Sequence, residues 1–273
     1  MNWEVVQFLL PAFCICLILT GIHVYLGIHV ISRGVIFVDL ALAQIAALGA
    51  TVAFLIGLPH EGGATYFVSL AFTLVGAAIF AATRNVEKRR IPQEAIIGVT
   101  YAISSAAIII LTDKSSHGAE HIKDMLVGNI LWVTWPEVLI TLALYSVISY
   151  FHFKFRKQFL MISLHPEEAK NKKISLKLWD LLFYASFGFV ITSSVKVAGV
   201  LLVFSYLVVP SIIGMLFSGT VRGRLAIGWS VGFLASIFGL TASYLFDLPT
   251  GACLVVLFGI LLLIAGVIRW FVK

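Results

Sequence analysis

The chain has 273 residues, of which 60% are hydrophobic and only 12% are charged. Ordinary soluble domains contain about 25% charged residues, so this composition excludes a water-soluble protein and indicates a chain that lies in a bilayer. The net charge of +6 is compatible with nucleic-acid binding, but its distribution along the chain has another explanation, given below.

Nine apolar stretches are candidates for membrane-spanning helices. Each approaches the roughly 20 residues that a helix needs to cross a bilayer, and none shows the alternation typical of a barrel strand. Lipid offers no partners to the backbone, so these stretches should be helices. The sequence therefore predicts an all-α, polytopic membrane protein with about 8–9 transmembrane helices, in a single domain over residues 1–273. In chain order the stretches are 5–27, 34–57, 65–83, 95–112, 136–153, 179–195, 197–217, 225–246 and 251–271.

Basic residues are concentrated in alternate loops. Only Lys114, Lys123 and Lys196 fall on one side of the membrane, whereas the other 16 of the 19 Lys and Arg residues fall on the opposite side. Because cytoplasmic loops carry the excess of basic residues, this distribution predicts a multi-pass protein of the cell membrane with its N-terminus outside and its C-terminus in the cytoplasm. Nucleic acid is not needed to explain the charge.

The second stretch contains two polar side chains, Asp39 and Gln44, in an otherwise apolar run. At 100° per residue Asp39 shares a narrow face with small alanines, whereas Leu42, Ile45 and Leu48 lie opposite. The two leucines are expected to contact lipid. A carboxylate in the membrane costs about 2.5–3.5 kcal/mol on insertion scales, so Asp39 is expected to face protein or a water-filled path. Two interpretations stay open: the two side chains are interhelical hydrogen-bonding groups, or they line the route of a substrate.

The outside segment 113–136 contains HGAEH at positions 117–121. This matches H-x-x-E-H, the pattern of inverted zinc peptidases, in which two imidazoles hold zinc and the glutamate handles a water proton. Because a glycine interrupts the pattern and the sequence shows no third ligand, we do not expect an enzyme. His117, Glu120 and His121 are candidates for a transient metal relay at the outer mouth, or for a solvated loop.

The longest inside segment includes HPEEAKNKKISLKLWD, residues 165–180. It predicts a short helix after Pro166, because acidic residues at the start and basic residues at the end complement the helix dipole. Such a helix is either a plain connector or a docking element for a soluble motor subunit. Asp180 and Lys196 are expected to mark the two ends of the following helix, which we expect to be short.

The eighth stretch carries Gly228, Gly232 and Ser236 four residues apart. Rows of small residues let helix backbones approach closely in a membrane, so this helix is expected to pack tightly on a neighbour. In the DLPTG segment that follows, Asp247 is expected to shape a turn before Pro249 rather than to bind an ion.

Five segments together, in this order, resemble the permease subunits of ABC importers for zinc, manganese or iron, the metal-type family called ABC type 3. The fourth of them, residues 195–217, resembles a pair of helices in that family that is joined near a glycine and broken by a proline. The resemblance covers the chain from about residue 10 to its end. The segments are QEAIIGVTYAISSAAIIIL (93–111), LVGNILWVTWPEVL (126–139), HPEEAKNKKISL (165–176), VKVAGVLLVFSYLVVPSIIGMLF (195–217) and SYLFDLPTGACLVVLFGILLL (243–263).

The resemblance implies a type II ABC importer-like permease that works with partner subunits. Two copies of the permease would form the pathway, a cytoplasmic ABC ATPase dimer would bind ATP and Mg, and an extracytoplasmic metal-binding protein would deliver the ion. The chain has no G-x-x-x-x-G-K-[ST] phosphate loop, so it is expected to be no enzyme and to bind no cofactor itself. In such permeases the cytoplasmic loop, here about residues 154–178, docks on the ATPase. The residues expected to make this contact are His165, Pro166, Glu167, Glu168, Ala169 and Lys170.

The chain departs from the family pattern in the second stretch. The family commonly reads Phe-x-Gly-Asp-Ala-Leu-Ser-His, and alignment on Phe37 puts Leu40 at the Asp and Gln44 at the His. The carboxylate–imidazole pair expected to touch a soft divalent ion is therefore absent as such, and the sequence does not identify the metal. The alternative function is a motor-independent secondary transporter or channel for another small solute, which inverted repeats with broken helices would favour.

Overall fold

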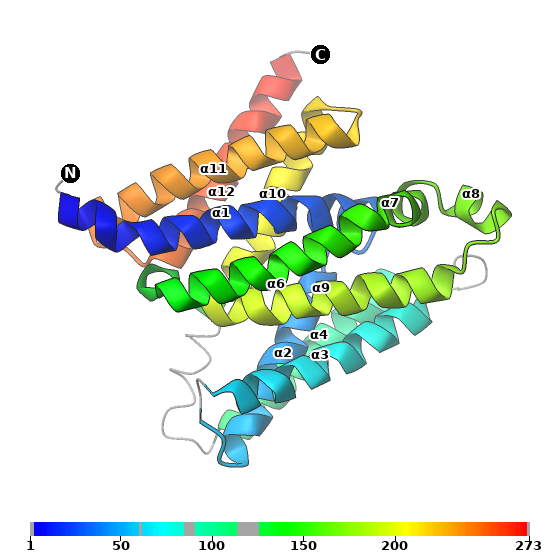
Figure 1. Ribbon diagram of the computed structural model, residues 1–273, viewed down its shortest axis with the longest axis horizontal. Coiled ribbons are helices and arrows are strands. Elements are labelled where there is room, and N and C mark those ends of the chain that lie inside the picture. Colours follow the sequence, from blue (N-terminus) through cyan, green and yellow to red (C-terminus); the bar gives the residue numbers. More distant parts are fainter. Residues whose placement is uncertain (1–2, 60–61, 85–90, 114–125, 272–273) are drawn as a thin grey trace. The chain divides into compact units, whose positions relative to one another are not determined.

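The computed structural model describes residues 3–59, 62–84, 91–113 and 126–271, and within these ranges the chain forms helices and no strand. Nine of the described helices are long and apolar enough to cross a membrane, which confirms the predicted all-α, polytopic fold. They are α1 (Trp3–Ser32), α2 (Val38–Leu55), α3 (Gly63–Thr83), α4 (Gln93–Thr112), α6 (Trp135–Lys154), α9 (Leu176–Ala198), α10 (Val200–Phe217), α11 (Val221–Phe246) and α12 (Thr250–Phe271). Three shorter helices are η1 (Ile130–Trp132), α7 (Arg156–Leu164) and α8 (Pro166–Asn171) (Figure 1).

The chain is divided into two compact units. Unit 1 comprises Met1–Ile31, Leu126–Tyr150 and Lys196–Lys273, and unit 2 comprises Ser32–Met125 and Phe151–Val195. Each unit is therefore assembled from segments that are far apart in the sequence. The expectation of one domain over residues 1–273 stays a prediction.

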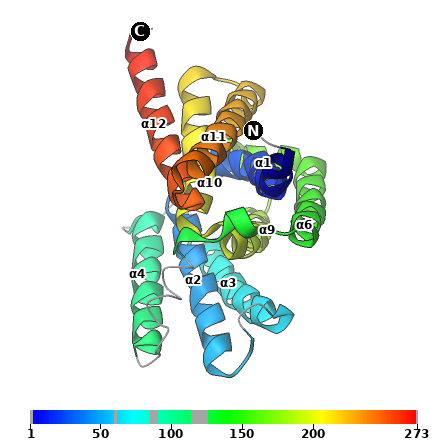
Figure 2. The same ribbon diagram turned by 90° about the vertical axis from the view of Figure 1, so that its left-hand side faces the viewer.

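In unit 1, α10, α11 and α12 pack against one another, as Figure 2 shows, and α1 packs closely on α11. Gly228 and Gly232 of α11 lie directly against Val24 and Thr20 of α1, so that a methyl group on either glycine would overlap the facing side chain. This contact confirms the close packing predicted from the row of small residues, since the side chains of Val24 and Thr20 occupy the space that the glycines leave open.

Two glycines of α1 provide a matched test of this packing. A methyl group on Gly27 would overlap the Leu207 carbonyl oxygen and the Ser211 hydroxyl of α10, whereas a methyl group on Gly21 would meet nothing within 4 Å. We expect Gly27→Ala to destabilise the protein by about 1–3 kcal/mol, the usual cost of overpacking. Gly21→Ala should leave the melting temperature unchanged or raise it, because alanine is favoured over glycine in a helix by about 0.5–1 kcal/mol. Thermal unfolding in detergent measures both, and equal shifts would contradict the α1–α10 contact.

The link between α9 and α10 is a single glycine. Gly199 has a φ of +76°, and the backbone of Gly128, with a φ of +67°, lies against it. A Cβ atom on either glycine would overlap the backbone of the other, and such φ values disfavour residues with a side chain. The helix pair joined at a glycine is thus present. The expected break at the proline is wrong, because α10 continues through Pro210 from Val200 to Phe217.

The turn between α11 and α12 agrees with its predicted role. Asp247 is exposed and ends α11 in the left-handed conformation with a φ of +51°. The Leu248 N–H donates to the Ser243 carbonyl at 3.1 Å, and the Ser243 hydroxyl donates to the Leu248 carbonyl at 2.8 Å. Asp247 therefore shapes a helix end rather than a binding site.

In unit 2, α2 packs against both α3 and α4. The Ser69 hydroxyl of α3 donates to the Ala46 carbonyl of α2 at 2.6 Å. The expectation that the leucines of this face contact lipid is wrong for Leu42, which is 0% exposed, and its neighbour on the face, Ile45, is 7% exposed. Both side chains lie over Gly76 of α3, where the missing side chain makes room for them. The α2 helix is therefore enclosed on its apolar side as well.

Candidate functional site

Asp39 lies in the first turn of α2 and is 2% exposed. Neither of its carboxylate oxygens has a hydrogen-bond partner among the described residues, so Asp39 forms no interhelical hydrogen bond within this part of the chain. Burying a polar group without a partner costs free energy, and an ionisable group at membrane depth that persists in spite of this cost is typical of a functional site.

A second carboxyl group lies at the start of the neighbouring helix. Glu94 is in the first turn of α4, and its Oε1 atom accepts a hydrogen bond from the Phe37 N–H at 3.1 Å. Its Oε2 atom is buried and has no partner in the described part of the chain. This contact between Glu94 and the residue before α2 could not be predicted from the sequence, because Glu94 and Phe37 are 57 positions apart.

Gln44 is also buried, with 6% of its surface exposed. It follows Asp39 on the same helix by five residues, which puts the two side chains about 140° apart around the axis. They can border one path between helices, but their directions do not converge on one ion. Within residues 3–59, 62–84, 91–113 and 126–271 there is no group of three or more His, Cys, Asp or Glu side chains that could hold a metal ion.

The candidate relay at the outer mouth, His117, Glu120 and His121, lies outside the described residues. Its role therefore stays a prediction.

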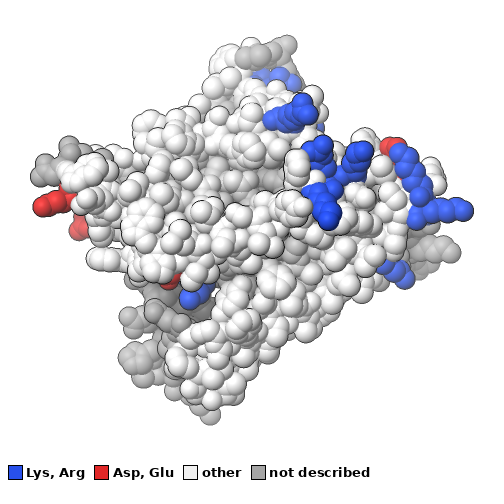
Figure 3. Space-filling model, viewed as in Figure 1, with Lys and Arg blue, Asp and Glu red and all other residues white. Residues whose placement is uncertain are grey.

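The predicted short helix after Pro166 is confirmed as α8, with acidic residues in its first turn and Lys170 in its last turn. Ala169 is completely buried, whereas the other docking candidates project outward or lie partly covered. The Lys172 ammonium donates to Glu168 at 2.7 Å and thereby lowers the pKa of this exposed carboxyl. Figure 3 shows several Lys and Arg side chains in the region of α7 and α8.

The helix α7 before it was not predicted from the sequence. Phe159, Ile162 and Ser163 of α7 are buried, and Phe159 stacks on the His152 ring with 4.2 Å between ring centroids. Their spacing of three and four residues is the signal of one buried helix face. It is easily missed because Arg156 and Lys157 give the segment the composition of a loop.

Asp180 has a role that the sequence did not indicate. It lies inside α9, a helix of 23 residues that begins at Leu176, so the expectation of a short helix bounded by Asp180 is wrong. Its side chain is 2% exposed and forms ion pairs with Arg33, at 2.8 Å, and with Arg84. Burial lowers the pKa of Arg33 to about 10, which leaves the guanidinium protonated at neutral pH.

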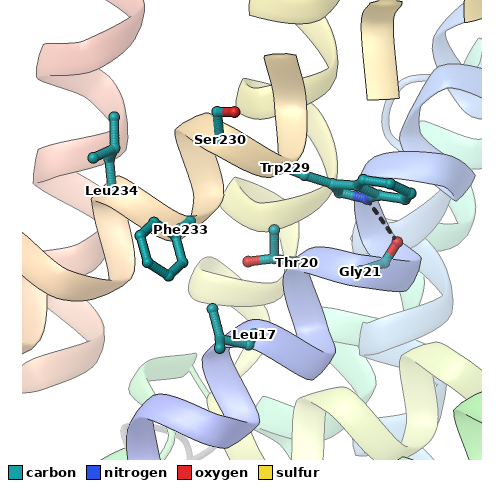
Figure 4. Close-up of a pocket in the computed structure, with 7 residues that line it drawn as sticks. All are labelled: Leu17, Thr20, Gly21, Trp229, Ser230, Phe233 and Leu234. Atoms are coloured by element: carbon teal, nitrogen blue, oxygen red, sulfur yellow. Dashed lines mark hydrogen bonds between the residues drawn. The ribbon is translucent and has the colours of Figure 1, made fainter. Parts of the chain in front are cut away.

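Unit 1 contains an open cavity of about 590 Å³ between α1 and α11, lined by Leu17, Thr20, Gly21, Trp229, Ser230, Phe233 and Leu234 (Figure 4). The polar groups of this lining are bonded to backbone carbonyls: Trp229 donates to Gly21 at 3.1 Å, and Thr20 donates to Cys16 at 2.8 Å. Because the lining has no carboxylate, imidazole or thiol, it does not have the chemistry of a transition-metal site.

The comparisons with known proteins agree on one protein family. The ABC 3 transport family matches residues 5–269. A "Probable iron transport system membrane protein" of Haemophilus influenzae is 26% identical over 251 residues, which are 92% of this chain and 90% of that protein. The "Manganese transport system membrane protein MntC" of Listeria monocytogenes is 26% identical over 246 residues, 88% of this chain and 83% of that protein.

Two solved structures have the same fold. The structure described as "PsaBC from Streptococcus pneumoniae in complex with Fab" superposes with a TM-score of 0.79 at 23% identity, covering 96% of this chain and 93% of that chain. A metal-chelate type ABC transporter in an inward-facing conformation gives a TM-score of 0.72 at 18% identity, covering 95% of this chain and 88% of that chain. These likenesses confirm the predicted importer-like helical fold.

The family match covers almost the whole chain, which decides between the candidate functions. It confirms the predicted permease subunit of an ABC importer over a motor-independent transporter or channel. It also confirms that the chain is not an enzyme, because in this family the ATPase activity lies in a separate subunit. The chain is a multi-pass membrane permease that belongs to the ABC 3 transport family.

Proposed function

We propose that this permease forms the translocation pathway for a divalent transition metal ion, which is zinc, manganese or iron. The observation that carries the proposal is the family match over residues 5–269, together with curated relatives whose names state iron or manganese transport. The carboxyl group of Asp39 on α2 supports it, because it is buried and has no hydrogen-bond partner among the residues that the structure describes, and carboxylate oxygen is a ligand for hard and borderline divalent ions.

An ABC permease works with an ATPase and a binding protein. In our proposal the partners are a second copy of this chain, a cytoplasmic ABC ATPase dimer that holds ATP and Mg, and an extracytoplasmic metal-binding protein. This chain itself binds no cofactor and no nucleic acid. Closure of the ATPase dimer on ATP then shifts the permease between outward and inward access, which is gating by rigid-body motion.

The proposed orientation has the N-terminus outside and the C-terminus in the cytoplasm, in a single transmembrane domain. It is supported by the 16 basic residues on one side of the membrane against three on the other. This orientation puts α7 and α8 on the cytoplasmic side and the segment with His117, Glu120 and His121 on the outside.

The proposed working residues fall into three groups. Asp39 and Gln44 line the pathway of the ion. The exposed part of α8 docks on the ATPase, within a loop of residues 154–178. The histidines and glutamate of the HGAEH segment pass the ion to the pathway at the outer mouth.

Reconstitution tests the proposed substrate. The permease, its ATPase and its binding protein are placed in vesicles, and uptake of Zn²⁺, Mn²⁺, Fe²⁺ and Co²⁺ is measured with and without ATP. We expect ATP-dependent accumulation of at least one of the first three ions and none by the permease alone. Uphill accumulation by the permease alone would contradict the proposal and revive the motor-independent transporter, and uptake of none of these ions would exclude a metal substrate.

A further inference from the structure

Three charged side chains meet inside unit 2 and form a cluster of Arg33, Arg84 and Asp180. Arg33 lies in the turn between α1 and α2, Arg84 at the end of α3, and Asp180 near the start of α9. The Nη1 atoms of both arginines bond to the same Asp180 oxygen, Oδ1. The side chains of Arg33, Arg84 and Asp180 are only 0%, 10% and 2% exposed.

The same two arginines also hold the end of α7. Arg33 Nε donates to the Ser163 hydroxyl at 2.8 Å, and Arg84 Nη2 donates to the Ile162 carbonyl at 3.1 Å. Ser163 lies two residues before His165, which immediately precedes the first residue of α8. Each guanidinium therefore bonds α9 through one nitrogen and α7 through another, a fork geometry that only arginine provides.

Packing makes this connection stiff. The Arg33 guanidinium lies over the Phe183 ring of α9, 3.8 Å from its centroid. Phe159 of α7 is 0% exposed and its ring centroid is 6.3 Å from that of Phe183. Since such interiors are close-packed and shift between discrete arrangements rather than deform continuously, α7 cannot move far without moving these neighbours.

Stability alone is a poor explanation of the cluster. Buried ion pairs often contribute no more to the free energy of unfolding than well-packed hydrophobic side chains would. Here, in addition, two positively charged arginines share one carboxylate. One donor, Arg33 Nη2, is buried with no partner among the described residues. What the cluster does provide is a direct connection from α7 to the turn that leads into α2, six residues before Asp39.

We propose that Arg33, Arg84 and Asp180 are positioning residues that transmit a displacement of the docking segment, α7 and α8, to the inner ends of α2 and α3. The inference rests on the proposed function, because it requires the ATPase to dock on α8. The cluster thereby determines how much ion movement follows from each ATP that the partner hydrolyses.

The complete transporter in vesicles provides the test, with the number of metal ions taken up per ATP hydrolysed as the measurement. Asp180→Asn keeps the shape of the side chain but removes the charge that both arginines share. We expect this ratio to fall about tenfold, within the range typical of coupling between sites, while the ATPase still co-purifies and still hydrolyses ATP. The matched control Asp247→Asn makes the same chemical change at an exposed turn and should keep the wild-type ratio.

Two further variants keep the test decisive if Asp180→Asn fails to fold. Arg33→Lys preserves the charge, but one ammonium group cannot replace the two-nitrogen fork to Ser163 and Asp180, so the ratio should again fall. Asp180→Glu keeps the carboxylate and should restore most of the coupling. A wild-type ratio in folded Asp180→Asn or Arg33→Lys would overturn the proposal.

Release of the ATPase from these variants would also overturn it, because the cluster would then only shape the docking surface. A failure of the docking site itself gives a different result. If a variant of the exposed α8 surface left the ATPase complex intact, the proposed docking site would be wrong and the inference would lose its premise. A wild-type ratio in the cluster variants, with docking on α8 intact, would overturn the inference alone.

Discussion

Reversal of two charges on α8 is expected to release the ATPase from the permease. Glu167 and Lys170 are both exposed, and Glu167→Lys with Lys170→Glu leaves the net charge of the chain unchanged. Loss of charged contacts at an interface typically costs about 2–5 kcal/mol when the pair is desolvated, so co-purification of the ATPase should fall at least about tenfold. Affinity purification of the tagged permease, followed by quantification of the bound ATPase, measures the effect.

The structure refines which α8 positions are suitable for this experiment. Ala169 is completely buried, so its substitution would test folding rather than docking. Arg222→Glu is a control, since it reverses an exposed charge at the start of α11, away from α8 in the sequence. If the α8 variant kept its melting temperature and still bound the ATPase as the wild type does, docking on α8 would be wrong.

Asp39→Asn is expected to have the second large effect, on transport. Loss of a group beside a bound metal ion costs about 10–100-fold in affinity or activity, so ion uptake should fall at least about tenfold. The melting temperature should stay unchanged or rise, because the variant removes a buried carboxyl group that has no hydrogen-bond partner in the described structure. ATP-dependent uptake and thermal unfolding of the same preparation measure both results.

A fall in the melting temperature of Asp39→Asn would instead indicate a structural role for Asp39. A lower melting temperature together with weak uptake would mean that the carboxyl group holds the helices together. Wild-type uptake would remove it from the pathway. Gln44→Ala, in the same helix, should also reduce uptake, whereas Asp247→Asn at the exposed end of α11 should not.

Local features of the sequence were sufficient to predict the membrane-spanning helices and the start of α8. A run of about 20 apolar residues must be helical in lipid, because its backbone has no other partners. The beginning of α8 could be predicted from Pro166, Glu167 and Glu168, since these residues act on the helix end next to them. The α7 helix escaped prediction because its buried face is short and lies among basic residues.

Contacts between distant segments could not be predicted in the same way. Asp180 lies 147 residues from Arg33 and 96 from Arg84, and nothing near any of the three residues indicates the other two. The burial of Leu42 and Ile45 depends on a glycine, Gly76, in another helix. Periodicity within α2 could show that they share a face, but not what covers that face.

The sequence by itself determined that the chain is a helical membrane protein with about 8–9 crossings of the bilayer, and the family whose motifs it resembles. These properties depend on composition and on residues close together in the chain, where hydrophobicity and helix geometry act directly. Only the tertiary structure decided that Asp39 is buried with no hydrogen-bond partner in the described part of the chain and that two arginines join Asp180 to the end of α7. These features depend on which helices pack together, because burial and ion pairing are properties of neighbours in space.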